Sequence, residues 1–327
     1  MRAAVYRSTG PAAEVLRVEE IAMPEPGPGQ VRVRIVVSGV NPTDWKSRSG
    51  ATPMAGGADF QVPNQDGAGV VDAVGAGVDP ARVGQRVWLY LAAFGNPYGT
   101  AAEYSVVPQE RAVPLPDGVD FDLGANLGVP ALTAHRCLYA DGPVDGRTVL
   151  VAGGAGAVGH YAIQFAKLRG ARVLTTVSGA EKATHASAAG ADAIINYRDE
   201  DVTDRVKSLT DGRGVDAIVE MDLTRNGQYY PGVLRPFARV VVYGMSGSEA
   251  TLPSLWMMQN SIQLRFIFIY EITPEDRTAV LAELTDHLAA KRLKHTIARR
   301  LPLARVAEAH DLVEAGKLVG NVVLDIA

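Results

Sequence analysis

The stretch "VLVAGGAGAVGHYAIQFAKLRGARVLTTVSGAEK", from Val149 to Lys182, places small residues where an apolar run changes into a helical pattern. Three of its glycines have the spacing G-x-G-x-x-G and directly follow an expected strand. Glycines at this spacing permit a tight turn, let a pyrophosphate approach backbone N–H groups, and allow a helix to pack closely on a sheet. The stretch therefore predicts a dinucleotide-binding loop rather than an ordinary glycine-rich turn. The expected contacts are Gly154, Gly156, Ala157, Val158 and Gly159.

The end of the next expected strand, at Ser178, indicates which dinucleotide binds. An NAD site usually has Asp or Glu about 20 residues beyond the glycines, and this carboxylate would repel a 2′-phosphate. Here no carboxylate follows until Glu181, whereas the Ser178 hydroxyl and the Lys182 ammonium suit a phosphate dianion. Tyr197, in "NYRDED", is a candidate third contact. We therefore expect NADPH as the cofactor; the alternative is that Lys182 is a solvated helix residue.

The rest of the chain changes its pattern near residue 120. Before this point, apolar runs at 30–40 and 67–78 are separated by turn-rich segments, which indicates a mainly β unit. After it, strand-like runs alternate with helical patterns, as in the βαβ units of a doubly wound parallel sheet. The expected strands of this part are 148–152, 172–177, 191–195, 215–219 and 239–243. The predicted fold class is α/β, and a last helix that ends near Gly316, with a final strand, is expected to return to the first domain.

Bulk properties exclude several classes of function. At 327 residues the chain can form two domains, and its net charge of -4 argues against nucleic acid as the main partner. The single cysteine, Cys137, excludes an intrachain disulfide framework, and we expect it to be a small buried side chain. No apolar run is long enough for a signal peptide or a membrane span, so we expect a cytoplasmic protein with no membrane partner.

The order of several short motifs is similar to that of a known family. These motifs are "GVNPTDWKSRSG", "NQDGAGVVDAVGAGV", "VGQRVW", "GTAAEY", "ALTA", "VLVAGGAGAVG", "GADAIINYRDED" and "GKLVGNVVLD". Together they resemble the zinc-independent, zeta-crystallin-like quinone oxidoreductases of the medium-chain dehydrogenase/reductase superfamily, over essentially the whole chain. The resemblance implies a GroES-like catalytic domain at 1–123, completed by 271–327, a Rossmann NADPH-binding domain at 124–270, and an active site between them. It also implies a homodimer, because "SIQLRFIFIY" (261–270) resembles the family's sheet-edge strand at the dimer axis.

The resemblance also allows a test for zinc, residue by residue. Zinc-dependent relatives place cysteine, histidine and cysteine where this chain has Asn41, Gln65, and Val129 or a close neighbour. A catalytic zinc needs three protein ligands from Cys, His, Asp or Glu, and these positions supply none. The six histidines also lack paired ligand spacing: His135, His160, His185, His287, His295 and His310. We therefore expect no metal.

Without a metal, reduction depends on positioning and hydrogen bonding. Quinones and α,β-unsaturated carbonyls suit this chemistry, because both accept hydride into a conjugated system that moves negative charge onto oxygen. Asn41 is a candidate N–H donor to the substrate oxygen or the cofactor's ribose, and Thr133 in "ALTA" resembles the threonine at the nicotinamide end. Asp66 is a candidate to orient Asn41 or Lys46, or equally to bond backbone amides. The alternative for Asn41 is that it only stabilises its loop, and the alternative for Thr133 is that it is an ordinary hydroxyl in a helix turn.

Further candidates follow from the resemblance, together with departures from it. Tyr243, Gly244 and Ser246 resemble the family's cofactor loop after a parallel strand, and Asn321 stands where relatives often carry lysine. Lys46 and Thr52 replace tyrosines that line the substrate cleft in many relatives. A different aromatic wall is possible, as is a core role for the same rings: Trp45, Trp88, Tyr90, Phe94 and Tyr98. Two other functions stay open, a specialised enoyl or polyketide-tailoring reductase and a catalytically silent NADPH-binding protein.

Overall fold

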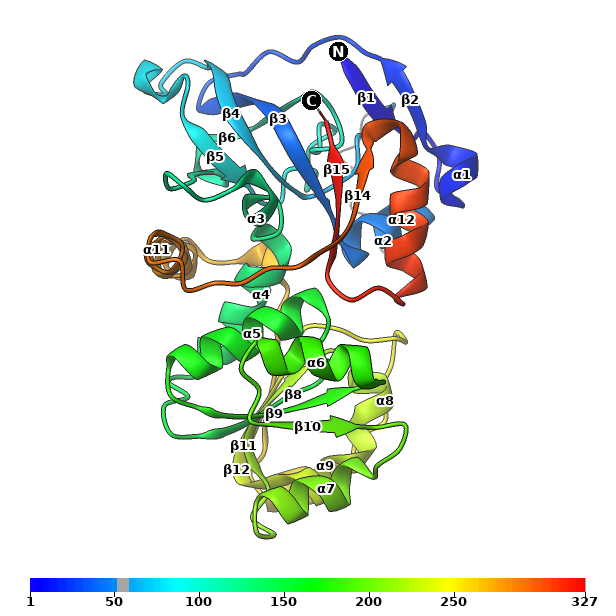
Figure 1. Ribbon diagram of the computed structural model, residues 1–327, viewed down its shortest axis with the longest axis vertical. Coiled ribbons are helices and arrows are strands. Elements are labelled where there is room, and N and C mark those ends of the chain that lie inside the picture. The colour runs from blue at the N-terminus through cyan, green and yellow to red at the C-terminus, as the bar shows by residue number, and fades with distance from the viewer. Residues whose placement is uncertain (52–58, 327) are drawn as a thin grey trace. The chain divides into compact units, whose positions relative to one another are not determined.

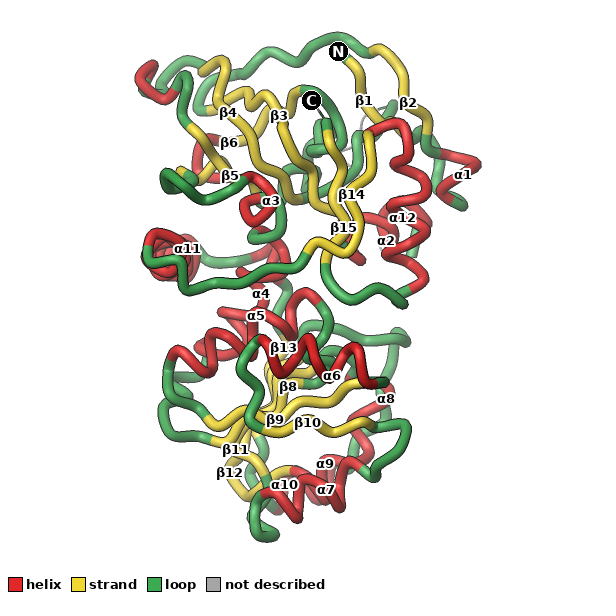
Figure 2. The backbone as a smooth tube through the Cα atoms, in the orientation of Figure 1, coloured by secondary structure: helices red, strands yellow, loops and turns green. Residues whose placement is uncertain are grey.

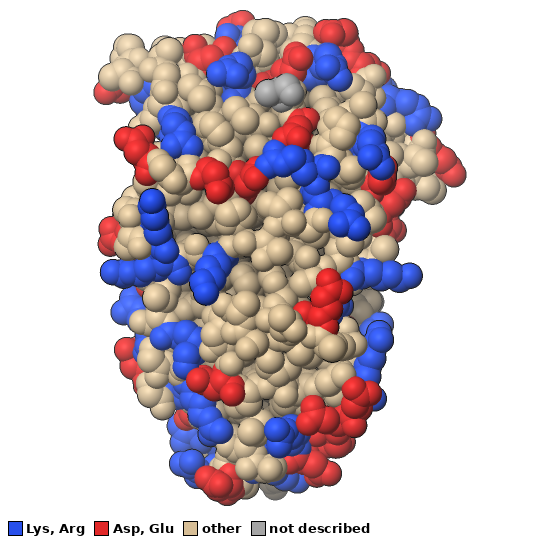
Figure 3. Space-filling view, in the orientation of Figure 1, with Lys and Arg blue, Asp and Glu red and all other residues tan. Residues whose placement is uncertain are grey.

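The computed structural model describes residues 1–51 and 59–326, and the chain divides into two compact units (Figure 1). The first unit comprises Met1–Val129 together with Pro274–Ala327, and the second comprises Pro130–Thr273. Each unit has its own sheet and its own cluster of buried apolar side chains. Acidic and basic side chains are mixed over much of the face drawn in Figure 3.

The second unit is built on a six-stranded parallel sheet. Its strands are β8 (Thr148–Val151), β9 (Arg172–Val177), β10 (Ala193–Asn196), β11 (Val215–Glu220), β12 (Leu234–Val242) and β13 (Gln263–Phe266). Their order across the sheet is β10-β9-β8-β11-β12-β13, so the chain starts in the middle and winds outward to both edges. This is the doubly wound Rossmann order, with its switch point between β8 and β11. The predicted fold class is therefore confirmed.

Helices cover both faces of this sheet, as Figures 1 and 2 show. They are most of α4 (Gly128–Tyr139), α5 (Ala157–Leu168), α6 (Ala180–Ala188), α7 (Val202–Leu209), α8 (Leu223–Asn226), α9 (Tyr230–Val233) and α10 (Ser254–Gln259). In Figure 1, α5 and α6 lie on one face, and α7 and α9 on the other. Strand residues such as Leu150 and Ile218 pack in one core with Val206 of α7 and Val233 of α9. Each such side chain contributes about 1.5–3 kcal/mol when fully buried.

Two strands start at residues other than those expected, whereas β8 and β11 differ from their expected ranges only by one residue at their ends. β10 begins at Ala193 rather than at 191, and the Asp192 carboxylate just before it accepts from the Val173 N–H at 2.7 Å. β12 begins earlier than expected, since Leu234 pairs with Val215 before a register shift. Phe237, in that shift, has a φ of 63°, a conformation that sequence periodicity does not reveal.

The first unit contains a seven-stranded mixed sheet and a separate two-stranded one. The strands are β1 (Arg2–Val5), β2 (Arg17–Glu20), β3 (Gln30–Val40), β4 (Asp66–Val74), β5 (Arg86–Leu89), β6 (Tyr104–Pro108), β7 (Ala112–Pro114), β14 (Ile297–Pro302) and β15 (Asn321–Asp325). The helices are α1 (Ala12–Val15), α2 (Pro42–Ser49), α3 (Phe121–Gly124), α11 (Pro274–Ala289) and α12 (Val306–Ala315). Short 3-10 turns occupy Pro80–Arg82, Gln109–Arg111, Gly227–Tyr229, Ile269–Glu271 and Leu303–Arg305 in the two units.

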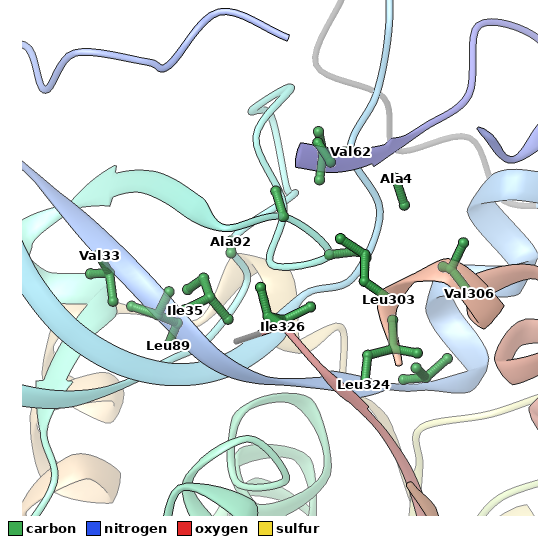
Figure 4. Close-up of a cluster of buried hydrophobic side chains, with 14 of the residues drawn as sticks. Ala4, Val33, Ile35, Val62, Leu89, Ala92, Leu303, Val306, Leu324 and Ile326 are labelled. Atoms are coloured by element: carbon green, nitrogen blue, oxygen red, sulfur yellow. The ribbon is translucent and has the colours of Figure 1, made fainter. Parts of the chain in front are cut away.

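The long strand β3 organises the larger sheet. It pairs with β4 along one side, and with β6 and then β15 along the other. α12 ends at Gly316, whose φ of 63° suits a helix C-cap, and β15 follows beside β3. The alternating side chains of β3, including Val33 and Ile35, belong to the same core as Leu324 of β15 and Val306 of α12, which Figure 4 draws. The C-terminal segment thus completes the first unit.

Candidate functional site

The glycine loop lies between β8 and α5, at the carboxyl end of the middle strand. Cβ atoms added at Gly154 and Gly159 would lie 2.1 Å from Thr175 Oγ1 and 2.4 Å from the Gly153 carbonyl oxygen. Gly154 therefore lacks a side chain because it packs on β9, and Gly159 because the start of α5 packs on the glycine loop. Gly156 is different: it is exposed, and a Cβ there would meet only the Gly153 oxygen at 3.4 Å. Nothing inside the protein requires glycine at 156, so its backbone is open to an outside group.

Gly156 is also the N-cap residue of α5, a twelve-residue helix. The first N–H groups of a helix have no acceptor within it, and the helix dipole adds positive charge at this end. Ala157 and Val158 of the first turn are partly exposed. A pyrophosphate fits this cradle, because it needs both close approach to the backbone and unpaired donors.

The residues expected near the adenosine ribose lie at neighbouring strand ends. β10 pairs in parallel with β9, and the Tyr197 N–H donates to the Val177 carbonyl at 3.1 Å. This bond brings Tyr197 beside Ser178, while Lys182 lies in the first turn of α6. All three side chains are at least partly exposed. Arg198 adds an exposed cation in this loop that the sequence analysis did not single out, because three acidic residues follow it.

A buried hydrogen-bond network holds the candidate catalytic asparagine. Asn41 Nδ2 donates to Asp66 Oδ2 at 2.7 Å, and the Val129 N–H donates to both Asp66 carboxylate oxygens at 2.8 and 3.0 Å. The carboxylate of Asp66 thus accepts from the Asn41 amide and from the first turn of α4, whose Val129 is 63 residues away in the sequence. Gly128 makes room for it, since a Cβ there would lie 2.0 Å from Asp66 Oδ1. Burial and the neighbouring Asp44 raise the pKa of Asp66.

Asp44 of α2 joins the same loops through their backbones. Its carboxylate accepts from the Asn41 N–H at 2.7 Å and from the Gln65 N–H at 3.0 Å. Burial raises the pKa of Asp44 to about 7, although these two hydrogen bonds oppose the shift. Asp44 and Asp66 therefore gather Asn41, Gln65 and Val129, the three positions compared with zinc ligands. The gathered groups are two amides and an aliphatic side chain.

Other predicted catalytic residues are placed as follows. The Lys46 ammonium lies 5.9 Å from the centre of the Trp45 ring, and Asp66 bonds Asn41 rather than Lys46. Thr133 is buried on α4, in the second unit. Asn321 is partly exposed at the start of β15. Thr52 lies outside the described residues.

Two of the five rings considered for an aromatic wall belong to the core, whereas Trp45, Phe94 and Tyr98 are partly exposed. Trp88 and Tyr90 are 0% and 1% exposed, because α3 packs on β4 and β5 and covers the Trp88 side of β5. Tyr98 packs edge-to-face on Phe60, with ring centres 5.6 Å apart. Trp45 is partly exposed and stays a candidate surface for a substrate.

The predicted loop after β12 carries Tyr243, Gly244 and Ser246. The phenol of Tyr243 is buried near Cys137 and Glu220, and burial raises its pKa well above the usual range. Tyr243 as a whole is partly exposed, and Ser246 is exposed. Cys137 is 2% exposed and burial raises its pKa, as expected for a core thiol.

Within residues 1–51 and 59–326, no group of three or more His, Cys, Asp or Glu side chains is placed to hold a metal ion. In the same residues, no helix has the length and apolar character needed to span a membrane.

Comparison with known proteins identifies the family. Residues 27–117 match the alcohol dehydrogenase GroES-like domain, and residues 157–286 match the domain described as zinc-binding dehydrogenase. The chain is 33% identical over 319 residues to a quinone oxidoreductase of Pseudomonas aeruginosa, covering 95% of each chain. It is 30% identical over 345 residues to a 2-haloacrylate reductase of a Burkholderia species, covering 99% of this chain and 98% of the relative.

Solved structures agree with this assignment. A mycobacterial protein in complex with NADPH superposes with a TM-score of 0.88 at 33% identity, covering 99% of both chains. A structure described as an NAD-dependent alcohol dehydrogenase superposes with a TM-score of 0.90 at 30% identity, covering 100% of both. Fold and glycine loop thus define an oxidoreductase of the medium-chain dehydrogenase/reductase superfamily. Within it, the chain belongs to the quinone oxidoreductase family.

Proposed function

We propose that this protein is an NADPH-dependent reductase that works without zinc and transfers hydride to a quinone or an α,β-unsaturated carbonyl compound. The observation that carries the proposal is the network of Asn41, Asp66 and the Val129 N–H. Where a zinc enzyme needs three metal ligands, this chain gathers hydrogen-bonding groups. A conjugated acceptor suits such a site, because its charge moves to an oxygen that one N–H can stabilise.

In this proposal the second unit holds NADPH, which supplies hydride from nicotinamide C4 when bound. The N–H groups at the start of α5 bind the pyrophosphate against Gly156. Ser178 and Lys182 bind the 2′-phosphate, with Tyr197 beside them. The NADPH complex of the mycobacterial neighbour supports this choice, and the missing carboxylate at the end of β9 argues against NADH.

In the first unit, Asn41 is the proposed hydrogen-bond donor to the substrate oxygen. One of its two amide hydrogens is held by Asp66, which fixes the plane of the amide. The second hydrogen then already has a fixed direction for its bond to the substrate oxygen. Little reorganisation is therefore needed as negative charge develops on that oxygen. Asp66 is 0% exposed and acts through Asn41. Lys46 is proposed to face the substrate, and Thr133 to contact the nicotinamide end.

The names of two relatives support both substrate classes, since one is a quinone oxidoreductase and the other reduces a 2-haloacrylate.

We also propose a cytoplasmic homodimer. β13 is an edge strand, and nearby Phe266 and Phe268 are 59% and 53% exposed. Pairing of β13 with a second copy would cover these rings and the free backbone groups of the edge.

Cofactor oxidation tests the proposal. We expect turnover with 1,4-benzoquinone, 9,10-phenanthrenequinone or a short alkenal, a preference for NADPH over NADH in kcat/KM, and no loss of rate with a zinc chelator. Tight NADPH binding without turnover of any acceptor would instead favour the silent binding protein. Stoichiometric zinc in the purified protein would contradict the proposed zinc independence. A preference for NADH would contradict the proposed cofactor.

Asn41→Ala tests the proposed donor directly. Removing one preorganised donor to a developing oxyanion costs about 10²–10³ in kcat. We expect a loss of this size with an unchanged Kd for NADPH, measured by calorimetry. The matched control is Gln259→Ala, which removes an exposed side-chain amide on α10 of the other unit. An unchanged kcat for Asn41→Ala would remove it from the mechanism.

A further inference from the structure

The loop after β11 contacts two parts of the proposed cofactor site at once. On one side, a Cβ added at Gly153 would lie 2.1 Å from Met221 Sδ, so the thioether packs on the glycine loop. On the other, a Cβ at Gly244 would lie 2.3 Å from the Met221 carbonyl oxygen. The segment from 220 to 226 therefore lies between the phosphate-binding loop and the loop after β12.

A series of hydrogen bonds joins this segment to the loop after β12. The Tyr243 N–H donates to the Glu220 carbonyl at 3.0 Å, and the Leu223 N–H donates to the Gly244 carbonyl at 3.3 Å. Further along, the Gly247 N–H donates to a side chain, Thr224 Oγ1, at 3.2 Å. Backbone pairing thus sets the start of the loop, and side chains hold the part that continues beyond it.

Asp222 makes the central side-chain contact. Its Oδ1 accepts from the Ser246 N–H at 3.1 Å and from Ser246 Oγ at 2.8 Å, and it also caps α8 through the Arg225 N–H at 3.4 Å. Its own N–H donates to Glu220 Oε1 at 2.7 Å, which fixes the backbone from which the side chain extends. Glu220 is buried and also accepts from Asn226 Nδ2 and the Tyr230 hydroxyl. The backbone of Asp222 is thus fixed by Glu220, and its carboxylate in turn binds Ser246.

We propose that Asp222 is a positioning residue that sets the loop 244–246 for the nicotinamide half of the cofactor. This inference rests on the proposed function. In a doubly wound sheet the two mononucleotide-binding halves lie on either side of the switch point. Because Ser178, Lys182 and Tyr197 follow β9 and β10, the adenosine half belongs to that side. β11 and β12, which precede Asp222 and Ser246, then form the nicotinamide side.

Two probes separate the halves of the cofactor. NADPH spans the whole site, whereas adenosine 2′,5′-bisphosphate carries only the adenosine half with its 2′-phosphate. Asp222→Ala removes the acceptor of two donors on Ser246, and we expect Kd for NADPH to rise about tenfold. We expect Kd for adenosine 2′,5′-bisphosphate to stay within twofold of wild type. Both are measured by calorimetry, with circular dichroism and the Tm as checks of folding.

Variants of matched shape distinguish hydrogen bonding from charge. Asp222→Asn keeps an Oδ1 acceptor but removes the charge, so we expect its affinity for NADPH to stay near that of wild type. Asp145→Ala removes an exposed carboxylate of the same unit and serves as the control. The proposal is overturned if Asp222→Ala binds NADPH normally, or if it weakens both probes equally. A wild-type protein that binds neither probe would instead overturn the proposed function. If Asp222→Ala does not fold, Ser246→Ala tests the loss of the shorter bond, with the same selective effect expected.

Discussion

The carboxyl group of Asp44 is buried and bonds the backbones of the Asn41 and Gln65 loops. Its pKa of about 7 in the folded protein lies above the ordinary value of 3.8, because burial penalises the charged form. Between these values the folded protein binds a proton that the unfolded chain does not. This group's contribution to the free energy of unfolding is therefore full below pH 3.8, falls as pH rises, and is lost above about 7.

Asp44→Asn should remove most of this pH dependence. A shift of one pKa unit corresponds to about 1.4 kcal/mol. From pH 5 to pH 8 we therefore expect the free energy of unfolding of wild type to fall by a few kcal/mol more than that of the variant. Urea unfolding at both pH values measures it, with Asp145→Asn as a control. Since Asp44 also raises the pKa of Asp66, part of the change comes through Asp66. The same fall in stability in both proteins would contradict the assignment.

Some site residues could be predicted from the sequence and others could not, for a physical reason. The Gly154–Gly159 motif and Ser178 are indicated by spacing from the strands, so their positions follow from local pattern. Asp44 and Asp222 act on backbone N–H groups of Gln65 and Ser246, which lie 21 and 24 residues away. Every non-proline residue carries such an N–H group, so no residue type marks the partner.

At the scale of elements, the parallel sheet is predictable because its strands are buried on both faces and are nearly continuous apolar runs. β9 occupies its expected range, 172–177, without change. The burial of Trp88 was harder to predict, because it depends on α3 packing on β4 and β5. α3 has only four residues, too few to show a periodic pattern.

The β8–α5 unit gives a prediction in which two glycines of one motif behave differently. A side chain at Gly156 meets little of the protein, so Gly156→Val should fold normally and block the pyrophosphate. One lost charge-assisted hydrogen bond is worth about 1.5–3 kcal/mol, so Kd for NADPH should rise at least about tenfold. Gly159→Ala forces a Cβ against the Gly153 carbonyl, and we expect it to cost about 1–3 kcal/mol of stability.

Calorimetry with NADPH and chemical unfolding separate these two effects. Gly170→Ala is not a neutral control, because Gly170 has a φ of 73°; Gly179 lies in open space but next to the proposed 2′-phosphate site. Ser187→Ala, on the exposed side of α6, is the better choice. Unchanged NADPH affinity in Gly156→Val would refute the assignment of the pyrophosphate to this loop. A strongly destabilised Gly156→Val would show that the protein has no room for a side chain at residue 156.

At the scale of the whole molecule, the last strand of each unit has a different place in its sheet. In the first unit β15 pairs with β3 and β14, so the C-terminal strand is enclosed within the sheet. In the second unit β13 ends the sheet, with Leu264 partly exposed and Phe266 exposed. An edge of this kind readily pairs with another strand, and pairing with a second copy is symmetric and self-limiting.

The proposed homodimer therefore predicts a sedimentation mass of twice 34.6 kDa at micromolar concentration. Replacing Phe266 and Phe268 by lysine puts like charges at the edge and removes apolar area that association would bury, so the double variant should sediment as a monomer. Leu168→Lys, on α5, is the matched control, since Leu168 is also exposed but does not lie on the edge strand. A wild-type protein that sediments as a monomer contradicts the dimer, and a double variant that stays dimeric places the interface elsewhere.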